Sequence, residues 1–227
     1  MRVPLPLLSR AGIGLLSALL ATPLLADALI TLDRNGSGEL PVEYRDADNL
    51  RIGSEESATW YLTSAGADFV IMKSPDGNKR FAMNMDEFLA RDDAPPGVEP
   101  DLESVSATKA DREETINGVT GQVYRVRGNS RSWELVLTAD DTIASVTEAV
   151  YGAEIRMAQM SGQAVSARPL ATELALAKSL GVAGILRGQL YTLAGLRQGE
   201  KLPDDRFRLA DDTLVVRDWK EMQDAYH

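Results

Sequence analysis

The first half of the chain alternates apolar and polar residues with the two-residue period of a β-strand. Short strands are predicted over 42–45 and 50–52, on either side of the turn-rich tetrapeptide 46–49. The alternation returns over 58–64, 67–73 and 80–85, where Gly66 and the Asp76-Gly77 turn separate the segments. The pattern therefore predicts an antiparallel meander from residue 42 to residue 85.

A short helix and a loop are predicted after the meander. Asn84 with Glu87 three residues later is typical of a helix start, and we expect this helix to run to Arg91. Residues 92–101 hold three prolines and a glycine, which indicates a loop. We interpret this loop as an excursion within one domain, because neither flanking part looks self-sufficient.

The second half changes from strands to helices. Strands are predicted over 121–127 and around 133–137, with a turn at 128–130 between them. Beyond Asp141 the apolar residues fall at helical spacing along one stripe, at Val146, Val150, Ala153, Met157 and Met160. Ser145 and Glu148 form the expected capping box of this helix, and Gly162 its expected end.

A second helix and further strands complete the chain. The helix is predicted to follow Pro169 and to close at Gly181. Strands are expected over 185–196 and 214–216, and a helical turn or two after Asp218. This order of strands, helices and strands predicts an α+β fold with helices packed on one side of an antiparallel sheet.

The N-terminus carries the pattern of a secretory signal. Arg2 and Arg10 are the only charges before an apolar run over 11–26, and Ala26-Asp27-Ala28 follows as a cleavage motif. The run is shorter than the ~20 residues of a transmembrane helix. We therefore predict a signal peptide over 1–26, with cleavage after Ala26 or Ala28, and one periplasmic domain over 29–227. No cysteine is present to carry a lipid anchor, so the exported chain is expected to be soluble.

Composition narrows the function classes. The chain has a net charge of −10, and loss of the signal peptide makes it more acidic. This balance argues against nucleic acids and anionic lipid surfaces as partners, because both recruit basic residues. Without cysteine no disulfide can form, so the core alone must hold the fold.

Candidate catalytic and metal-binding residues are few. His227, the last residue, is the only histidine, so no triad and no zinc, copper or haem site based on histidine or cysteine is expected. No nucleotide-binding motif indicates a cofactor. We therefore predict a non-catalytic protein with no cofactor and no metal.

Two further hypotheses involve carboxylates. Residues 33–40 partly match a calcium-binding loop, but Tyr44 stands where a bidentate glutamate is required, so a polar turn between two strands is favoured. A hydrolase that uses only carboxylates would need two acids facing one cleft, and the adjacent acid pairs of this chain fall in predicted loops or helix caps.

The methionines suggest an adaptable apolar surface. Five of them fall on predicted sheet and helix faces, at Met72, Met83, Met85, Met157 and Met160. Flexible thioether side chains of this kind line hydrophobic ligand grooves, and they also fill ordinary cores.

Three stretches carry a family resemblance. They are VEYRDADNLRI with ATWYLTSAGADFVIMK and KRFAMNMDEF in the first half, REETINGVTGQVYRVRG in the centre, and GVAGILRGQLYTLAGLRQGEKLPDDRFRLADD near the end. Together they resemble exported relatives of the periplasmic lipoprotein-carrier (LolA/LolB-like) superfamily.

The resemblance implies a strongly curved antiparallel sheet, an incomplete barrel, with helices packed on one side as a lid. It also implies an apolar groove for acyl chains. The residues expected to line it are Trp60, Leu62, Phe69, Ile71, Phe81 and Met83 on the sheet and Val150 and Met157 on the helix.

Two hypotheses of function remain. The first is a carrier or binding protein for a lipid, an acylated protein or another hydrophobic ligand, which requires a cavity. The alternative is an envelope accessory factor that binds a partner protein through a sheet edge or helix face, which requires no cavity.

Overall fold

A computed structural model describes residues 27–129 and 131–226. The predicted signal peptide over 1–26 and the C-terminal His227 lie outside these residues. Within them, no helix is long and apolar enough to cross a membrane.

The described chain folds into twelve strands, four α-helices and one 3-10 turn. In chain order they are β1 (Ala28–Asp33), β2 (Glu39–Asp46), β3 (Asn49–Ile52), β4 (Thr59–Ser64), β5 (Ala67–Lys73), β6 (Arg80–Asn84), α1 (Met85–Leu89), β7 (Ser106–Ile116), β8 (Val119–Arg127), β9 (Ser132–Thr138), α2 (Asp141–Met160), α3 (Ala164–Ser179), β10 (Gly184–Arg187), β11 (Thr192–Gln198), η1 (Asp204–Phe207), β12 (Thr213–Val216) and α4 (Trp219–Tyr226). The predicted α+β class is confirmed.

All strands belong to one sheet, in the order β12-β6-β5-β4-β3-β2-β1-β11-β10-β9-β8-β7. Neighbouring strands are antiparallel, except that β12 pairs with β6 in parallel. The expectation of a purely antiparallel sheet is therefore wrong at this edge. Here the chain crosses back over the sheet through η1, so β12 enters beside β6 in the same direction.

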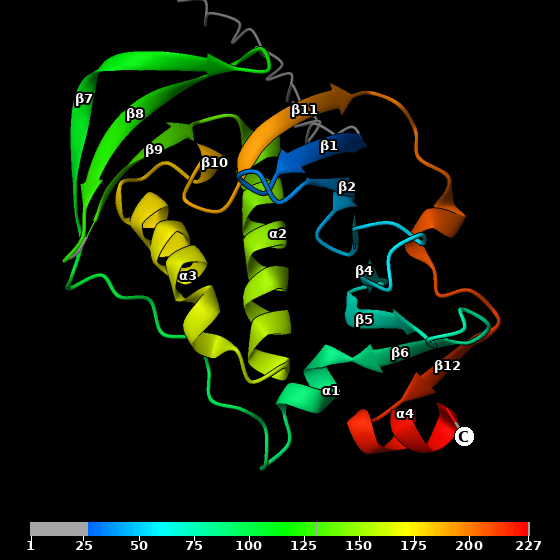
Figure 1. The fold of residues 1–227 in the computed structure, drawn as a ribbon. Coiled ribbons are helices and arrows are strands. Elements are labelled where there is room, and N and C mark those ends of the chain that lie inside the picture. Colours follow the sequence, from blue (N-terminus) through cyan, green and yellow to red (C-terminus); the bar gives the residue numbers. More distant parts are fainter. Residues whose placement is uncertain (1–26, 130, 227) are drawn as a thin grey trace, which may run out of the picture.

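The sheet curves around α2, with α3 lying beside it (Figure 1). Register shifts interrupt the pairing of β1 with β11, β2 with β3, β7 with β8 and β9 with β10. Irregularities of this kind bend strands and increase their twist. The backbone N–H of Ile185 in β10 donates to the Thr147 hydroxyl of α2 at 3.0 Å, which fixes this helix against β10.

The meander is confirmed, and so is the first helix, although it ends at Leu89 and not at Arg91. Strands β2 to β6 follow one another as antiparallel hairpins. The Asn84 side chain caps α1 by accepting from the backbone N–H groups of Asp86 and Glu87. The polar turn predicted within 33–40 is formed by residues 34–38, because β1 and β2 pair directly on either side of it.

Both long helices begin earlier than predicted. Asp140 caps α2 by accepting from the Ile143 N–H at 2.9 Å, so Ser145 and Glu148 lie inside the helix and form no capping box. Helix α3 begins at Ala164 and includes Pro169. A proline near a helix start loses only one hydrogen bond of the first turns, so it did not have to mark the boundary.

Two strand predictions also change. The single strand expected over 185–196 is the hairpin β10–β11, which turns where the Gly188 N–H donates to the Tyr191 carbonyl at 2.8 Å. Strand β7 was not predicted. Its sequence, SATKADREETI, is largely charged, because it forms a sheet edge with one partner, and charged side chains protect such edges from further pairing.

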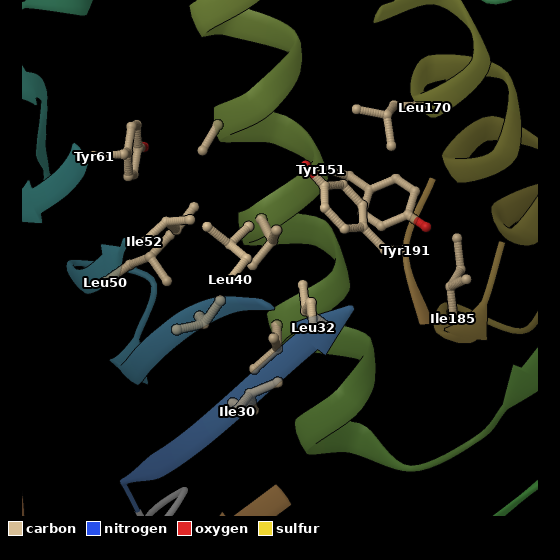
Figure 2. Close-up of a cluster of buried hydrophobic side chains, with 14 of the residues drawn as sticks. Ile30, Leu32, Leu40, Leu50, Ile52, Tyr61, Tyr151, Leu170, Ile185 and Tyr191 are labelled. Atoms are coloured by element: carbon tan, nitrogen blue, oxygen red, sulfur yellow. The ribbon is translucent and has the colours of Figure 1, made fainter. Parts of the chain in front are cut away.

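The buried side chains form two clusters on opposite faces of the sheet. The large cluster fills the inner, concave side and includes Ile30, Leu50 and the α2 residues Val146 and Val150. Figure 2 shows side chains of the strands, among them Tyr61 of β4, facing α2 within this cluster. A smaller cluster lies on the outer face of β4, β5 and β6.

Candidate functional site

Two cavities lie between α2 and the strands of the meander. We call the first the Arg156 cavity; its volume is about 320 Å³. It is lined by Tyr44, Ala47, Leu50, Tyr61, Thr63, Asp68, Ser145, Glu148, Ala149, Gly152, Ala153 and Arg156. Small-molecule sites occupy about 300–1,000 Å³, so this space can hold a small ligand.

Small residues on α2 create the Arg156 cavity. Ser145, Ala149, Gly152 and Ala153 recur at helical spacing on the flank that faces it. A Cβ atom added at Gly152 would meet no heavy atom within 4 Å. The cavity is therefore open space beside the helix backbone.

One ion-pair network borders the Arg156 cavity. Arg156 of α2 pairs with Asp68 of β5 and with Asp86 of α1. The Thr63 hydroxyl donates to Asp68 at 2.7 Å, and burial raises the pKa of the neighbouring Tyr61. These contacts attach α2 to the meander and give the cavity a polar border beside an apolar wall.

The second space, which we call the Met157 cavity, has a volume of about 550 Å³. It is lined by Arg34, Glu39, Leu40, Pro41, Ile52, Gly53, Ser57, Ala58, Thr59, Trp60, Tyr61, Glu154, Met157, Ala158, Ser161, Gln163 and Ser166. Arg34 and Glu154 form an ion pair at 3.2 Å on its border. Its lining mixes apolar side chains with polar and charged ones.

The predicted groove residues do not share one face. Trp60, Leu62 and Ile71 belong to the outer cluster, with Phe69 packed against them. Strand alternation predicted their common face, but only the tertiary structure shows that this face points away from α2. The interpretation of all six strand residues as one wall therefore needs correction.

The other four predicted residues lie on the α2 side. Phe81 and Met83 are fully buried in the inner cluster. Neither side chain lines the Arg156 cavity or the Met157 cavity. Val150 faces a tightly filled apolar contact with β1 and β10. Met157 lines the Met157 cavity, and Trp60 also borders it.

Sequence reasoning missed most of the cavity lining. Tyr61 stands on the face of β4 opposite to Trp60 and Leu62, and Leu50 lies in a strand of four residues. Tyr44 belongs to β2, from which no groove residue was predicted. The available signal was the set of small residues at helical spacing, Ser145, Ala149, Gly152 and Ala153. Small side chains on one flank of a helix indicate that this flank leaves space beside the helix backbone.

A buried carboxyl group lies in a different part of the fold. Glu173 of α3 is fully buried and accepts from the Gln189 backbone N–H at 2.7 Å. The Tyr151 hydroxyl of α2 donates to it at 3.5 Å. Burial raises the pKa of Glu173 to about 7, while the Gln189 hydrogen bond opposes the shift. Glu173 therefore joins α3 to α2 and to the β10–β11 turn.

The carboxylates considered as metal ligands are scattered. In the turn between β1 and β2, Asp33 accepts from the Gly36 N–H at 3.3 Å, as in an ordinary polar turn. Among residues 27–129 and 131–226, no three acidic or histidine side chains gather closely enough to hold a metal ion.

Comparisons with protein-family models, with curated proteins and with solved structures give no match to this chain. The function is therefore inferred from the geometry of the two cavities.

Proposed function

We propose that this chain is a non-catalytic, periplasmic binding or carrier protein for a lipid or another hydrophobic ligand. The observation that carries the proposal is the pair of cavities between α2 and the inner face of β2, β3 and β4. Each combines apolar side chains with a charged pair, and an amphiphile needs both surfaces.

The resemblance to the lipoprotein-carrier superfamily agrees with this proposal. That family implies an incomplete barrel whose helices cover an apolar hollow. In this chain α2 takes the place of such a covering helix, because the sheet curves around it (Figure 1). A lid role for α2 would let ligands enter by a small movement of the helix away from β2–β5.

The Gly152 position allows a direct test. A leucine at Gly152 would project into the Arg156 cavity without meeting other atoms at its Cβ, and leucine favours the helix by about 0.5–1 kcal/mol over glycine. We expect Gly152→Leu to fold normally and to lose most of the ligand that co-purifies with the wild type. The matched control Gly152→Ala adds one methyl group and should retain the ligand.

The measurement is lipid extraction and mass spectrometry on protein purified from the periplasm without detergent. A periplasmic protein of similar size serves as the background. A lipid present in near-stoichiometric amount in the wild type and in Gly152→Ala, but not in Gly152→Leu, supports the carrier. Equal lipid in all three variants would show that this cavity is not the binding site.

Export implies a defined mature N-terminus. Asp27 pairs with Arg45 at 3.1 Å, accepts from the Leu202 N–H at 2.6 Å, and its carbonyl accepts from the Gly199 N–H at 3.1 Å. Ala28 is fully buried in β1. Cleavage after Ala28 would remove both residues, so we expect cleavage after Ala26. Intact mass and N-terminal sequencing of the periplasmic protein should give Asp27 first; a chain that starts at Leu29 would contradict this.

A protein-interaction role is the second candidate, and one observation favours it. Strand β12 forms an edge of the sheet, and its Leu214 and Val215 are 48% and 60% exposed. Exposed aliphatic side chains on an edge strand suit the addition of a partner strand. A lipid-free wild-type protein, together with a partner crosslinked at β12, would favour this function over the carrier.

A further inference from the structure

The two cavities follow one line through the fold. Along α2, the Arg156 cavity is lined by residues from 145 to 156 and the Met157 cavity by residues from 154 to 161. Along β3, the first is lined by Leu50 and the second by Ile52. Both cavities therefore occupy successive parts of the same space between α2 and the meander.

Strands β2 and β4 give the same order. On β2 the lining passes from Tyr44 to Leu40, and on β4 from Thr63 to Thr59. These strands run antiparallel to β3, so the residue numbers of their lining side chains fall in the direction in which those of β3 rise. Four elements thus agree on the direction from one cavity to the other.

Tyr61 is the one residue that lines both cavities. It lies in the middle of β4, between Thr63 and Thr59, and its side chain points to the inner face, where it is 3% exposed. Figure 2 places its ring beside Leu50 and Ile52, which line the cavities on either side. On α2, the Arg156 cavity is lined near this point by Ala153, whose side chain is a single methyl group.

We infer that Tyr61 divides a single groove and limits the length of the chain that the protein binds. This inference rests on the proposed carrier function and names its ligand class: single-chain amphiphiles whose tail ends at the Tyr61 ring. Packing in the inner cluster holds the ring, and the Tyr61 hydroxyl also lies 3.2 Å from the Thr63 hydroxyl. The ring therefore acts as a fixed partition.

The charges along the groove favour a neutral head group. At one end Arg156 pairs with Asp68 and Asp86, and at the other Arg34 pairs with Glu154, so both arginines already have acidic partners. An anionic head group would have to displace one of these acids from its arginine, whereas hydroxyl groups can bond to both members of a pair. Monoacylglycerols are therefore suitable probes.

The test measures affinity against chain length by calorimetry, with monoacylglycerols from the octanoyl to the stearoyl ester. For the wild type we expect the affinity to rise with length, by up to roughly fourfold per methylene, and then to level off when the tail reaches Tyr61. Tyr61→Ala should remove this limit, so that its affinity for the stearoyl ester exceeds that of the wild type by a factor of about ten or more. Tyr61→Phe keeps the ring and should keep the wild-type profile.

The outcomes separate the inference from the function on which it rests. If Tyr61→Ala binds the series with the wild-type length limit, Tyr61 does not divide the groove, although the carrier function stands. If no ester binds to the wild type or to Tyr61→Ala, the carrier function fails for single-chain lipids and this inference fails with it. If Tyr61→Ala does not fold, as judged by circular dichroism, Tyr61→Leu provides the same comparison with less loss of packing.

Discussion

Replacing Glu173 by glutamine should stabilise the protein at about pH 8 and leave its stability almost unchanged at about pH 4. Burial raises the pKa of Glu173 from its ordinary 4.5 to about 7. Between these two values the folded protein keeps a proton that the unfolded chain has lost. The free energy of unfolding therefore falls as the pH rises through this interval, and it is constant with respect to this group above it.

The expected gain at the higher pH is about 3 kcal/mol, because each pKa unit corresponds to about 1.4 kcal/mol. Glutamine has nearly the shape of glutamate and keeps an oxygen that can accept from the Gln189 N–H. It has no charge to bury, so the loss of stability with rising pH should disappear.

Urea denaturation of wild type and Glu173→Gln at several pH values measures this effect. The difference between the two proteins removes the contributions of all other titrating groups. Glu99→Gln is the matched control, because Glu99 is exposed in the loop before β7 and no contact is expected to change. A variant less stable than wild type at both pH extremes would show that the donors around Glu173 hold its ionised form.

Replacing Phe207 by alanine should lower the free energy of unfolding by about 3–5 kcal/mol, the usual cost of removing a buried aromatic ring. Phe207 is 2% exposed and belongs to η1, a turn of four residues that covers the outer face of β3 and β4. The guanidinium of Arg45 lies 4.8 Å from the centre of its ring. Such a short turn has little stability of its own, so the buried ring must supply most of its attachment.

The same urea titration, carried out on Phe207→Ala, gives this cost. Leu214→Ala is the control for the loss of a large apolar side chain, since Leu214 is 48% exposed on β12 and should change stability by less than about 0.5 kcal/mol. A cost for Phe207→Ala below about 1 kcal/mol would mean that the polar contacts of Arg45 hold the turn without the ring. The groove lies on the other face, so lipid binding should survive this substitution in the folded protein.

The sequence by itself determined the local elements wherever one signal dominated. Alternation over 58–64, 67–73 and 80–85 predicted three strands, because in each of them apolar side chains recur every second residue on a sheet that is buried. The Asn84 cap and the helical stripe from Val146 to Met160 were also readable, since each depends on residues within a few turns. The α+β class followed from the order of these elements.

Local sequence patterns did not predict the elements that form because of a tertiary contact. Strand β7 has no hydrophobic alternation, and it forms because β8 supplies its hydrogen-bond partners. The Gly188 turn inside the segment 185–196 depends on the close approach of Glu173, which leaves no room for a side chain there. Nothing within the segment itself indicates that approach.

Only the tertiary structure decided which face of each strand encloses the groove. Trp60 and Tyr61 are neighbours of similar size, and both are buried, so the sequence treats them alike. The curvature of the sheet puts α2 on the side of Tyr61 and η1 on the side of Trp60. A strand has two equivalent faces until other elements pack on it, and for this reason the sequence could predict the strands but could not select the residues that line the cavities.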